Sequence, residues 1–246
     1  MRGRPPVTTA RRDPATYPPY FYEAYRSTVR RSPRQPPVRL PATLSELTGP
    51  GPAVSLSSGE DADLTRNMGT GGEAIGERMI VTGRVTDDRD DPVAGTLVEV
   101  WQANAAGRYR HKVDQHGAPL DPNFLGWGRC LTDADGVYRF VTIRPGAYPW
   151  ENHPNAWRPP HIHFSLLGPA WGARLITQMF FPGDPLLAFD PIFNAVPEAA
   201  RERLVARYAH DVTQAGYALG YRFDIVLVGP RATPAEPFET SAREGR

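Results

Sequence analysis

The chain has little that would link it to a membrane, to nucleic acid or to an oxidising compartment. Its 246 residues include one cysteine, Cys130, which cannot form an internal disulfide and fits a reducing cytosol. The formal net charge is only +1, so neither nucleic acid nor an acidic membrane is indicated as a partner. No apolar run is long enough to cross a bilayer, and the first residues lack the apolar centre of a secretory signal. We therefore expect a cytoplasmic globular protein.

Proline, by contrast, is concentrated at the start of the chain. Residues 1–54 hold 11 of the 27 prolines and few apolar runs, so this segment cannot build its own core. It is either a flexible tail or an ordered arm that lies on the body and on a partner subunit. Aromatic side chains favour the ordered arm because they are costly to leave in water. They are Tyr17, Tyr20, Phe21, Tyr22 and Tyr25.

From residue 78 onward, short segments rich in β-branched and aromatic residues predict strands. Turn signals separate them, for example at residues 133–136 and 144–146. This spacing favours a β-sandwich over alternating β-α-β units. We thus expect two parts, an N-terminal arm over residues 1–77 and a main domain over residues 78–246. The predicted strands cover residues 78–87, 96–103, 137–143, 161–167, 174–181 and 221–228.

Helices are predicted to be a minor component of the fold. One helix is expected from Val196 to about His210, opened by Pro197 and rich in helix formers. The polar tail, residues 231–246, is expected to lie over the surface. The predicted fold class is therefore all-β, with a β-sandwich core, a long irregular N-terminal arm and one or two short helices.

His161 and His163 form the first candidate for a functional site. One residue separates them in a predicted strand, so both side chains point to the same face. Neutral imidazoles bind Zn, Cu, Fe and Ni, so the pair suggests a metal without naming it. Tyr109 and Tyr148, which lie in predicted loops, would be hard, charged oxygen donors if ionised, and such donors suit a trivalent metal. From the residues alone, a structural histidine pair with packing tyrosines, or a zinc or copper site, remains possible.

The surroundings of these residues resemble the intradiol ring-cleavage dioxygenases. The similarity extends over roughly residues 20–235, and the block from Tyr148 to His163 is its most specific part. The resemblance implies one non-haem Fe(III) per chain and O₂-dependent cleavage of an aromatic diol between its two hydroxylated carbons. The matching segments are residues 32–35, 75–85, 96–112, 121–124, 146–150, 157–164 and 221–227.

The same resemblance implies roles for individual residues. The implied metal ligands are Tyr109, Tyr148, His161 and His163. Tyr109 is also implied as a catalytic group, together with Arg158 beside the substrate and Gln178 in the same pocket. Simpler alternatives are a salt bridge that pins a loop for Arg158 and a cross-strand hydrogen bond for Gln178. The implied substrate-pocket residues are Tyr25, Trp101, Trp150 and Ile192.

Within the family, the resemblance favours members that act on 3,4-dihydroxybenzoate and pair with a homologous alpha chain. The implied product is 3-carboxy-cis,cis-muconate, in aromatic catabolism through the β-ketoadipate pathway. We find no convincing cation here for the ring carboxylate and expect it on the companion chain. Alternatives are a catechol or hydroxyquinol 1,2-dioxygenase, which tends to carry a helical N-terminal domain, and a metal-free scaffold subunit, which should lack the four ligands.

Overall fold

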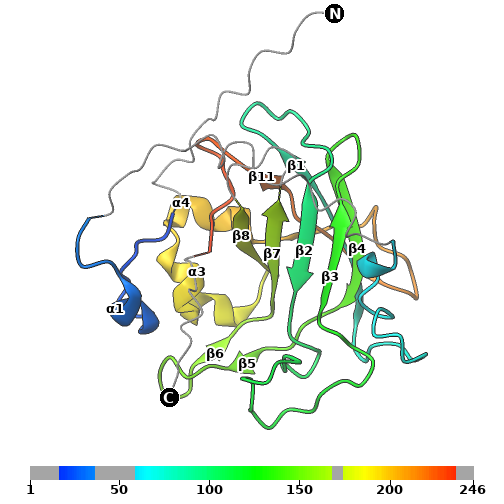
Figure 1. The fold of residues 1–246 in the computed structure, drawn as a ribbon, viewed down its shortest axis with the longest axis horizontal. Coiled ribbons are helices and arrows are strands. Elements are labelled where there is room, and N and C mark those ends of the chain that lie inside the picture. Colours follow the sequence, from blue (N-terminus) through cyan, green and yellow to red (C-terminus); the bar gives the residue numbers. More distant parts are fainter. Residues whose placement is uncertain (1–16, 37–58, 168–173, 237–246) are drawn as a thin grey trace, which may run out of the picture.

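The computed structural model describes residues 17–36, 59–167 and 174–236, and β-strands dominate them (Figure 1). The elements, in chain order, are α1 (Ser27–Arg31), η3 (Gly59–Ala62), β1 (Arg78–Thr86), β2 (Leu97–Trp101), β3 (Trp127–Leu131), β4 (Val137–Ile143), β5 (Tyr148–Pro149), β6 (Trp157–Arg158), β7 (His161–Leu167), β8 (Leu175–Phe180), η4 (Pro185–Phe189), α3 (Pro191–Ala195), α4 (Glu198–Arg201), η5 (Glu202–Leu204), β9 (Arg207–Tyr208), β10 (Leu219–Arg222) and β11 (Ile225–Val226).

Two sheets pack face to face. In one sheet, β1 pairs antiparallel with β4 on one side and parallel with β10 and β11 on the other, and β9 pairs with β10. The second sheet is antiparallel, with the order β3-β2-β7-β8. Figure 1 shows the two sheets one behind the other. The predicted all-β sandwich is confirmed, and the described residues also contain short helices.

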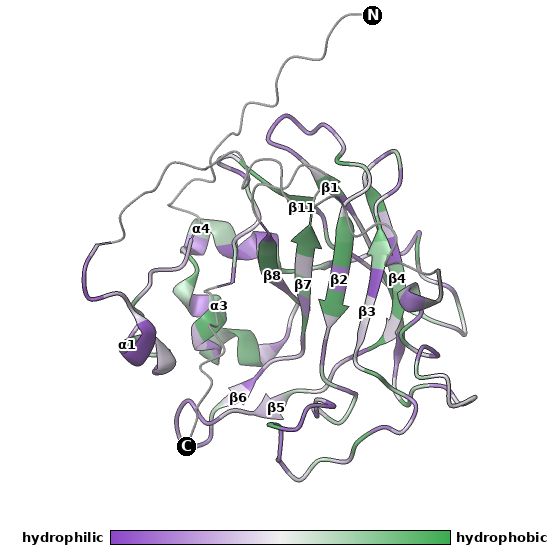
Figure 2. Ribbon diagram, in the orientation of Figure 1, coloured by the Kyte–Doolittle hydropathy of each residue, from purple (hydrophilic) through white to green (hydrophobic). Residues whose placement is uncertain are grey.

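Alternation of side chains along the strands builds the core between the sheets. In β7, Ile162, Phe164 and Leu166 are fully buried and join the main hydrophobic cluster. Figure 2 shows β7 and its neighbour β2 as largely hydrophobic strands interrupted by hydrophilic bands. Since successive side chains point to opposite faces, His161 and His163 lie on the outer face of the sheet.

That outer face is not left open to water. Phe180 at the end of β8 packs in a second, smaller cluster with Val196, Ala200 and Leu204, which belong to the segment around α4 and η5. In Figure 1, α3 and α4 lie beside β8, and the short β5–β6 pair lies at the lower end of the sandwich. This cover is what allows a polar site on the outer face to be buried.

The predicted strands are confirmed for β1, β2, β4, β7 and β8, whereas one strand was missed and one predicted strand is divided. The segment Trp127–Leu131 was not predicted, yet it forms β3 against β2; Gly128 and Arg129 weaken its strand pattern, and Arg129 forms an ion pair with Asp61. The predicted last strand is divided into β10 and β11 at residues 223–224, where the Asp224 side chain accepts from the Arg84 backbone and the Phe223 carbonyl accepts from the Tyr138 hydroxyl.

The predicted helix from Val196 to about His210 is wrong over its second half. The helical part ends with η5 at Leu204. Ala206 then donates its backbone N–H to the Phe180 carbonyl at 2.9 Å, and Tyr208 pairs with Tyr221 in β10. Strand pairing with two other segments thus replaces the helix that the local sequence favours.

The expectation that the C-terminal tail lies over the surface is also wrong for its described part. Ala232 and Thr233 are buried, and Thr233 exchanges two hydrogen bonds with Val226. Pro234 accepts a hydrogen bond from Thr177 in β8 at 2.7 Å, and the Glu236 backbone donates to Ile176. Residues 237–246 lie outside the described residues.

The N-terminal arm is described over residues 17–36, and it is ordered there around one tyrosine. Tyr25 is buried, whereas Tyr20 and Phe21 are exposed. Asn152, itself buried, accepts a hydrogen bond from the Arg26 backbone at 2.8 Å and donates one to the Ala24 carbonyl at 2.7 Å. Asn152 therefore fixes the arm on either side of Tyr25. The division at residue 77 stays a prediction.

No helix among residues 17–36, 59–167 and 174–236 has both the length and the apolar composition of a membrane span.

Replacing Asn152 with alanine should release the arm without unfolding the sandwich. The variant loses both side-chain hydrogen bonds and leaves the Arg26 N–H and the Ala24 carbonyl without these partners, at a cost of about 1–3 kcal/mol. Tryptic cleavage after Arg26 should accelerate about tenfold or more, measured on the native protein by mass spectrometry. Glu151→Gln, at an exposed neighbouring position, is the control. Equal cleavage rates in the two variants would show that Asn152 does not hold the arm.

Candidate metal centre

A row of three neighbouring side chains crosses the outer face of the second sheet. The register places Trp101 of β2 opposite His163 of β7, and His163 opposite Gln178 of β8. The Trp101 and His163 rings are stacked, with centroids 4.8 Å apart and planes 3° from parallel. Val100, Ile162 and Met179, each next in sequence to one of the three, are in the core. The strand alternation that fills the core therefore also assembles this row.

The two imidazoles turn the same ring nitrogen toward one another. The Nε2 atoms of His161 and His163 are 3.2 Å apart, and both residues are buried. His161 Nδ1 lies 2.7 Å from the Pro159 carbonyl, which can only accept, so this nitrogen carries the proton. Burial, together with the charge of Arg158 and the nearby His163, lowers the pKa of His161 well below its usual value. His161 is therefore neutral, with its Nε2 lone pair facing His163.

The first tyrosine, Tyr109, follows a tight turn organised by Asn104. The Asn104 side chain accepts hydrogen bonds from the backbones of Ala106 and Arg108 at 3.0 and 2.9 Å. Gly107 in this turn has a φ of +80°, and a Cβ there would meet the Ala147 carbonyl oxygen at 2.1 Å. Glycine thus allows the segment that precedes Tyr148 to pass close to the turn.

The second tyrosine, Tyr148, lies in β5 rather than in a loop, and it pairs directly with Arg158 of β6. The Tyr148 hydroxyl is 3.5 Å from His161 Nε2, and the rings of Tyr109 and Tyr148 meet edge to face with centroids 5.4 Å apart. Tyr109 also approaches His163, at a centroid distance of 6.4 Å. The structure therefore brings the four predicted ligands together from three separate segments.

Both phenols are held in their neutral form. Burial raises the pKa of Tyr109 well above its usual value, and the neighbouring Tyr148 adds to the rise. Burial also raises the pKa of Tyr148, although the charge of Arg158 opposes that rise. The Tyr109 hydroxyl oxygen is buried, and no described group forms a hydrogen bond of good geometry with it. Tyr148 is nevertheless close enough to raise the pKa of Tyr109.

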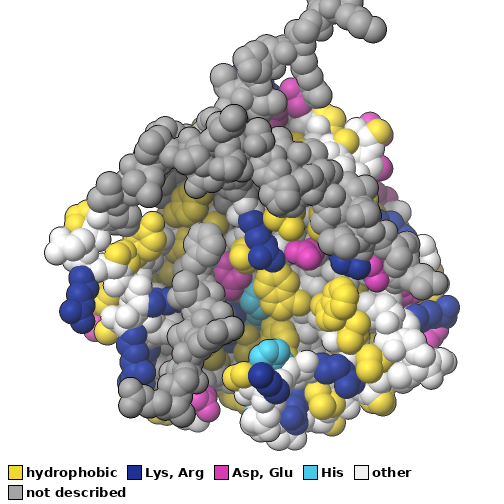
Figure 3. Space-filling model, in the orientation of Figure 1, with side chains coloured by type: hydrophobic (Ala, Val, Ile, Leu, Met, Phe, Trp, Pro, Cys, Tyr) yellow, Lys and Arg dark blue, Asp and Glu magenta, His cyan; other side chains and the backbone are white. Residues whose placement is uncertain are grey.

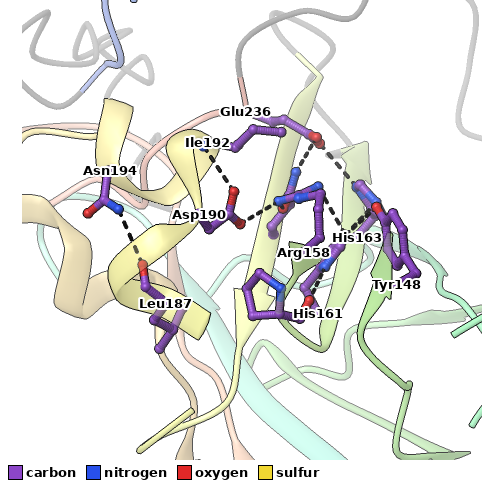
Figure 4. Close-up of polar contacts among 11 residues, drawn as sticks. Tyr148, Arg158, His161, His163, Leu187, Asp190, Ile192, Asn194 and Glu236 are labelled. Carbon is purple, nitrogen blue, oxygen red and sulfur yellow. Dashed lines mark hydrogen bonds and ion pairs between the residues drawn. The ribbon is translucent and has the colours of Figure 1, made fainter. Parts of the chain in front are cut away.

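Arg158 occupies the centre of a buried hydrogen-bond network, drawn in Figure 4. Its Nη2 atom donates to Gln178 Oε1 at 2.7 Å and to Asp190 Oδ2 at 2.8 Å, and Nη1 lies 3.2 Å from His161 Nε2. Burial works against the charge of Arg158, but Asp190 and Tyr148 outweigh it and the pKa is raised. The guanidinium is therefore a permanent buried cation beside the two imidazoles.

Glu236 reaches the site from the C-terminal segment. Its Oε2 atom is 3.2 Å from His163 Nδ1, and its Oε1 accepts a hydrogen bond from Gln178 Nε2 (Figure 4). Burial would raise the pKa of Glu236, but attraction to His163 and Arg158 outweighs it, so the pKa is lowered and the carboxylate is charged.

The predicted pocket residues surround this network on different sides. Trp150 lies beside Arg158, whose guanidinium carbon is 5.6 Å from the ring centroid, and Tyr25 of the arm meets Trp150 edge to face at 5.2 Å. Ile192 shares the lining of a small cavity with Gln178 and Glu236. Trp101 stacks on His163, as described above. Figure 3 shows histidine recessed among hydrophobic side chains on this face, with acidic and basic side chains nearby.

The donor set fits a hard, highly charged metal ion. Among residues 17–36, 59–167 and 174–236, no group of three or more His, Cys, Asp and Glu side chains is arranged to bind a metal. The phenol oxygens of Tyr109 and Tyr148 are the donors that would join the two imidazoles in holding a metal here. The Tyr109 hydroxyl, which forms no hydrogen bond of good geometry with a described group, and the facing Nε2 atoms match the donors that such a site needs. Phenolate oxygens suit Fe(III) better than Zn(II) or Cu(I).

Comparison with known families identifies the class to which this β-sandwich chain belongs. The profile described as Dioxygenase matches residues 50–229, and the profile described as Protocatechuate 3,4-dioxygenase beta subunit N terminal matches residues 10–43. The chain belongs to the intradiol dioxygenase family.

Individual relatives show which members of the family this chain is similar to. The protocatechuate 3,4-dioxygenase beta chain of Burkholderia cepacia is 60% identical, over 94% of this chain and 98% of its own length. The alpha chain of the same organism is 31% identical, over 65% of this chain and 77% of its own. The solved structure of 3-chlorocatechol 1,2-dioxygenase from Rhodococcus opacus has the same fold, with a TM-score of 0.54, 24% identity, and coverage of 86% of this chain and 79% of that one.

Two residues of the site were missed by the sequence analysis. Asp190 precedes Pro191 and accepts a hydrogen bond from Ile192 N, so the Asp-Pro pair was a readable signal for a helix start. Nothing local indicated that its second oxygen pairs with Arg158. Glu236 lies in a polar, proline-containing tail, and no sequence signal distinguishes it from a surface carboxylate.

Two aspartates allow the Arg158 ion pair to be tested against a matched control. Asp184 and Asp190 both precede a proline and both cap a short helix, but only Asp190 also pairs with a buried arginine. Asp184→Ala should cost about 0.5–2 kcal/mol, the usual loss of a helix cap. Asp190→Ala should cost about 3–5 kcal/mol, because it leaves Arg158 charged and buried without that partner. Urea unfolding measures both, and equal losses would contradict a structural role for the ion pair.

Proposed function

We propose that this chain is the iron-bearing subunit of a non-haem Fe(III) intradiol dioxygenase that cleaves 3,4-dihydroxybenzoate (protocatechuate). The product is 3-carboxy-cis,cis-muconate, which contains both oxygen atoms of O₂. The convergence of two phenols and two imidazoles, with no other donor cluster in the described residues, is the observation that carries this proposal. The 60% identity to a protocatechuate 3,4-dioxygenase beta chain supports the substrate.

The four ligands in this proposal are Tyr109, Tyr148, His161 and His163. When bound there, Fe(III) supplies Lewis acidity that lowers the pKa of phenols and of a catechol. Without it, burial keeps both tyrosines neutral, so metal binding must release their protons. The Tyr109 hydroxyl forms no hydrogen bond of good geometry with a described group. We assign its oxygen, once ionised, as the base that takes a proton from a substrate hydroxyl, the catalytic role of this residue.

Arg158 and Gln178 act on charge and orientation in this proposal. The Arg158 guanidinium stays positive because of Asp190, and it stabilises negative charge that develops on the ring of the diol. Gln178 accepts from Arg158 and so keeps that cation in place beside the imidazoles. Four largely apolar side chains limit the access of water to the site: Tyr25, Trp101, Trp150 and Ile192.

A homologous alpha chain completes the proposed enzyme. In the described residues, Nη2 of the site's own cation, Arg158, donates to both Asp190 and Gln178, so this nitrogen does not bind a ring carboxylate as well. The curated relatives of this chain include both beta and alpha chains of protocatechuate 3,4-dioxygenases. We infer that the alpha chain supplies the group that binds the carboxylate.

Tyr148→Phe tests the ligand set. The purified parent protein should hold one iron per chain and show the visible absorption of tyrosine bound to Fe(III). The variant should lose most of that absorption, and its kcat should fall at least a hundredfold, because an oxygen donor to the metal is removed. Iron analysis and a visible spectrum make the measurement. Tyr208→Phe, at an exposed strand position, should keep both properties. An unchanged spectrum in Tyr148→Phe would remove this residue from the ligand set.

Co-production with the homologous alpha chain tests the partner and the substrate together. The complex should turn over 3,4-dihydroxybenzoate at least tenfold faster than this chain alone, because the carboxylate then finds its binding group. Catechol and hydroxyquinol, which lack the carboxylate, should gain much less. Oxygen uptake with the three substrates provides the readout. Full activity of the single chain on 3,4-dihydroxybenzoate would contradict the proposed partner, and a preference for hydroxyquinol would support the alternative substrate class.

A further inference from the structure

The proposed function assigns no role to the buried carboxylate of Glu236. The side chain of Glu236 is 8% exposed, and each of its oxygens is used by a different residue of the site. Oε2 faces His163 Nδ1, and Oε1 accepts from Gln178 Nε2. The backbone of Glu236 is tied to β8 through the Ile176 carbonyl at 2.7 Å, and Pro234 just before it is tied to Thr177. The carboxylate is therefore held at this place by two backbone contacts with β8.

We propose that Glu236 is a positioning residue that fixes the proton of His163 on Nδ1 and, at the same time, fixes the orientation of the Gln178 amide. The consequence for metal binding rests on the function proposed above. Glu236 does not touch the metal position in this proposal; it acts through His163 and Gln178.

The argument for His163 begins with its partner imidazole. His161 donates from Nδ1 to the Pro159 carbonyl, so its Nε2 is an acceptor. Arg158 supports this assignment, because a guanidinium can only donate and it lies 3.2 Å from the same Nε2. His163 alone would have a choice. It could donate from Nε2 to His161 Nε2, 3.2 Å away, or from Nδ1 to Glu236.

Glu236 decides that choice. A carboxylate facing Nδ1 favours a proton there and repels a bare lone pair, so the Nε2 lone pair of His163 stays free. A metal needs that lone pair, and a carboxylate that bonds the far nitrogen of a ligand histidine holds the ring and makes it a better ligand. For His161, the Pro159 backbone carbonyl accepts the Nδ1 hydrogen bond. For His163, the acceptor is the Glu236 side chain, which a substitution can remove.

Gln178 is the second residue that depends on Glu236. Its Oε1 accepts from Arg158 Nη2, and its Nε2 donates to Glu236. If the amide turned over, an NH₂ group would face the guanidinium, and neither group can accept. The donors and acceptors are all matched only if the group between Gln178 and His163 is a carboxylate, which accepts from both. The chain of hydrogen bonds runs from Asp190 through Arg158 and Gln178 to Glu236 and His163.

Glu236→Gln is the sharp substitution because it keeps the size and removes one acceptor. If the new amide oxygen accepts from His163, its NH₂ group faces Gln178, which must turn against Arg158. If the oxygen accepts from Gln178, the NH₂ group faces Nδ1 of His163 and drives the proton to Nε2, where it blocks a metal. Glu198→Gln makes the same chemical change on an exposed helix position and is the control.

Two measurements on the full chain test the proposal. In metal-free protein labelled with ¹⁵N-histidine at pH 9, His163 should carry its proton on Nδ1 in the parent and in Glu198→Gln, and should populate the Nε2–H form in Glu236→Gln. In competition with a chelator, Fe(III) should be held about 10–100-fold more weakly by Glu236→Gln than by the control. Melting temperatures show whether each variant is folded.

The outcomes separate this proposal from the proposed function. A parent His163 with its proton on Nε2 would overturn the proposal, and so would a folded Glu236→Gln with unchanged tautomer and unchanged iron retention. If that variant fails to fold, the tautomer of the parent still decides. If the parent binds no iron at all, the proposed function fails, while the ¹⁵N measurement on metal-free protein continues to test Glu236.

Discussion

The alternation of side chains in β7 is the constraint on which the rest of the structure depends. Ile162, Phe164 and Leu166 must face the core between the sheets, because that is where their apolar surface leaves water. His161 and His163 are therefore committed to the other face, whatever lies there. A shift of one residue in register would put imidazoles into the core and expose the apolar residues, so the position of the site and the stability of the sandwich are fixed by the same pairing.

Burial of that second face creates the need for the hydrogen-bond network. A buried polar group is costly unless it is paired, and here a guanidinium, two imidazoles, an amide and two carboxylates share a small space. They are accommodated because donors and acceptors alternate along the chain from Asp190 to Glu236. The exceptions at the site are the Tyr109 hydroxyl and Arg158 Nε, which are buried without a well-formed hydrogen bond. That an incomplete partner set occurs at the candidate metal position is what a group reserved for another ligand would show.

Segments far apart in the sequence contribute to the network in a physically consistent way. The strands β2, β7 and β8 supply the row of Trp101, His163 and Gln178, which needs only the sheet register. The β5–β6 pair adds Tyr148 and Arg158 as cross-strand neighbours. The arm, which Asn152 holds in place, and the C-terminal segment, which carries Glu236, then cover the site. Strands thus carry Tyr148, Arg158, His161 and His163, whereas Tyr109 lies in an irregular segment after a turn.

The sequence by itself determined the sandwich class, five of its strands, the shared face of the histidine pair and, through resemblance, the four candidate ligands together with Arg158 and Gln178. These features depend on local alternation and on short motifs, so they are visible without coordinates. Only the tertiary structure decided that residues 205–208 leave the predicted helix, that Asp190 neutralises Arg158, and that Glu236 enters the site from a polar tail. In each of these cases the deciding partner is distant in the sequence: Phe180 and Tyr221 for the lost helix, Arg158 for Asp190, and His163 for Glu236. A hydrogen bond or strand pairing between distant segments does not change the local sequence pattern around either partner. Such contacts can therefore be identified only from the tertiary structure.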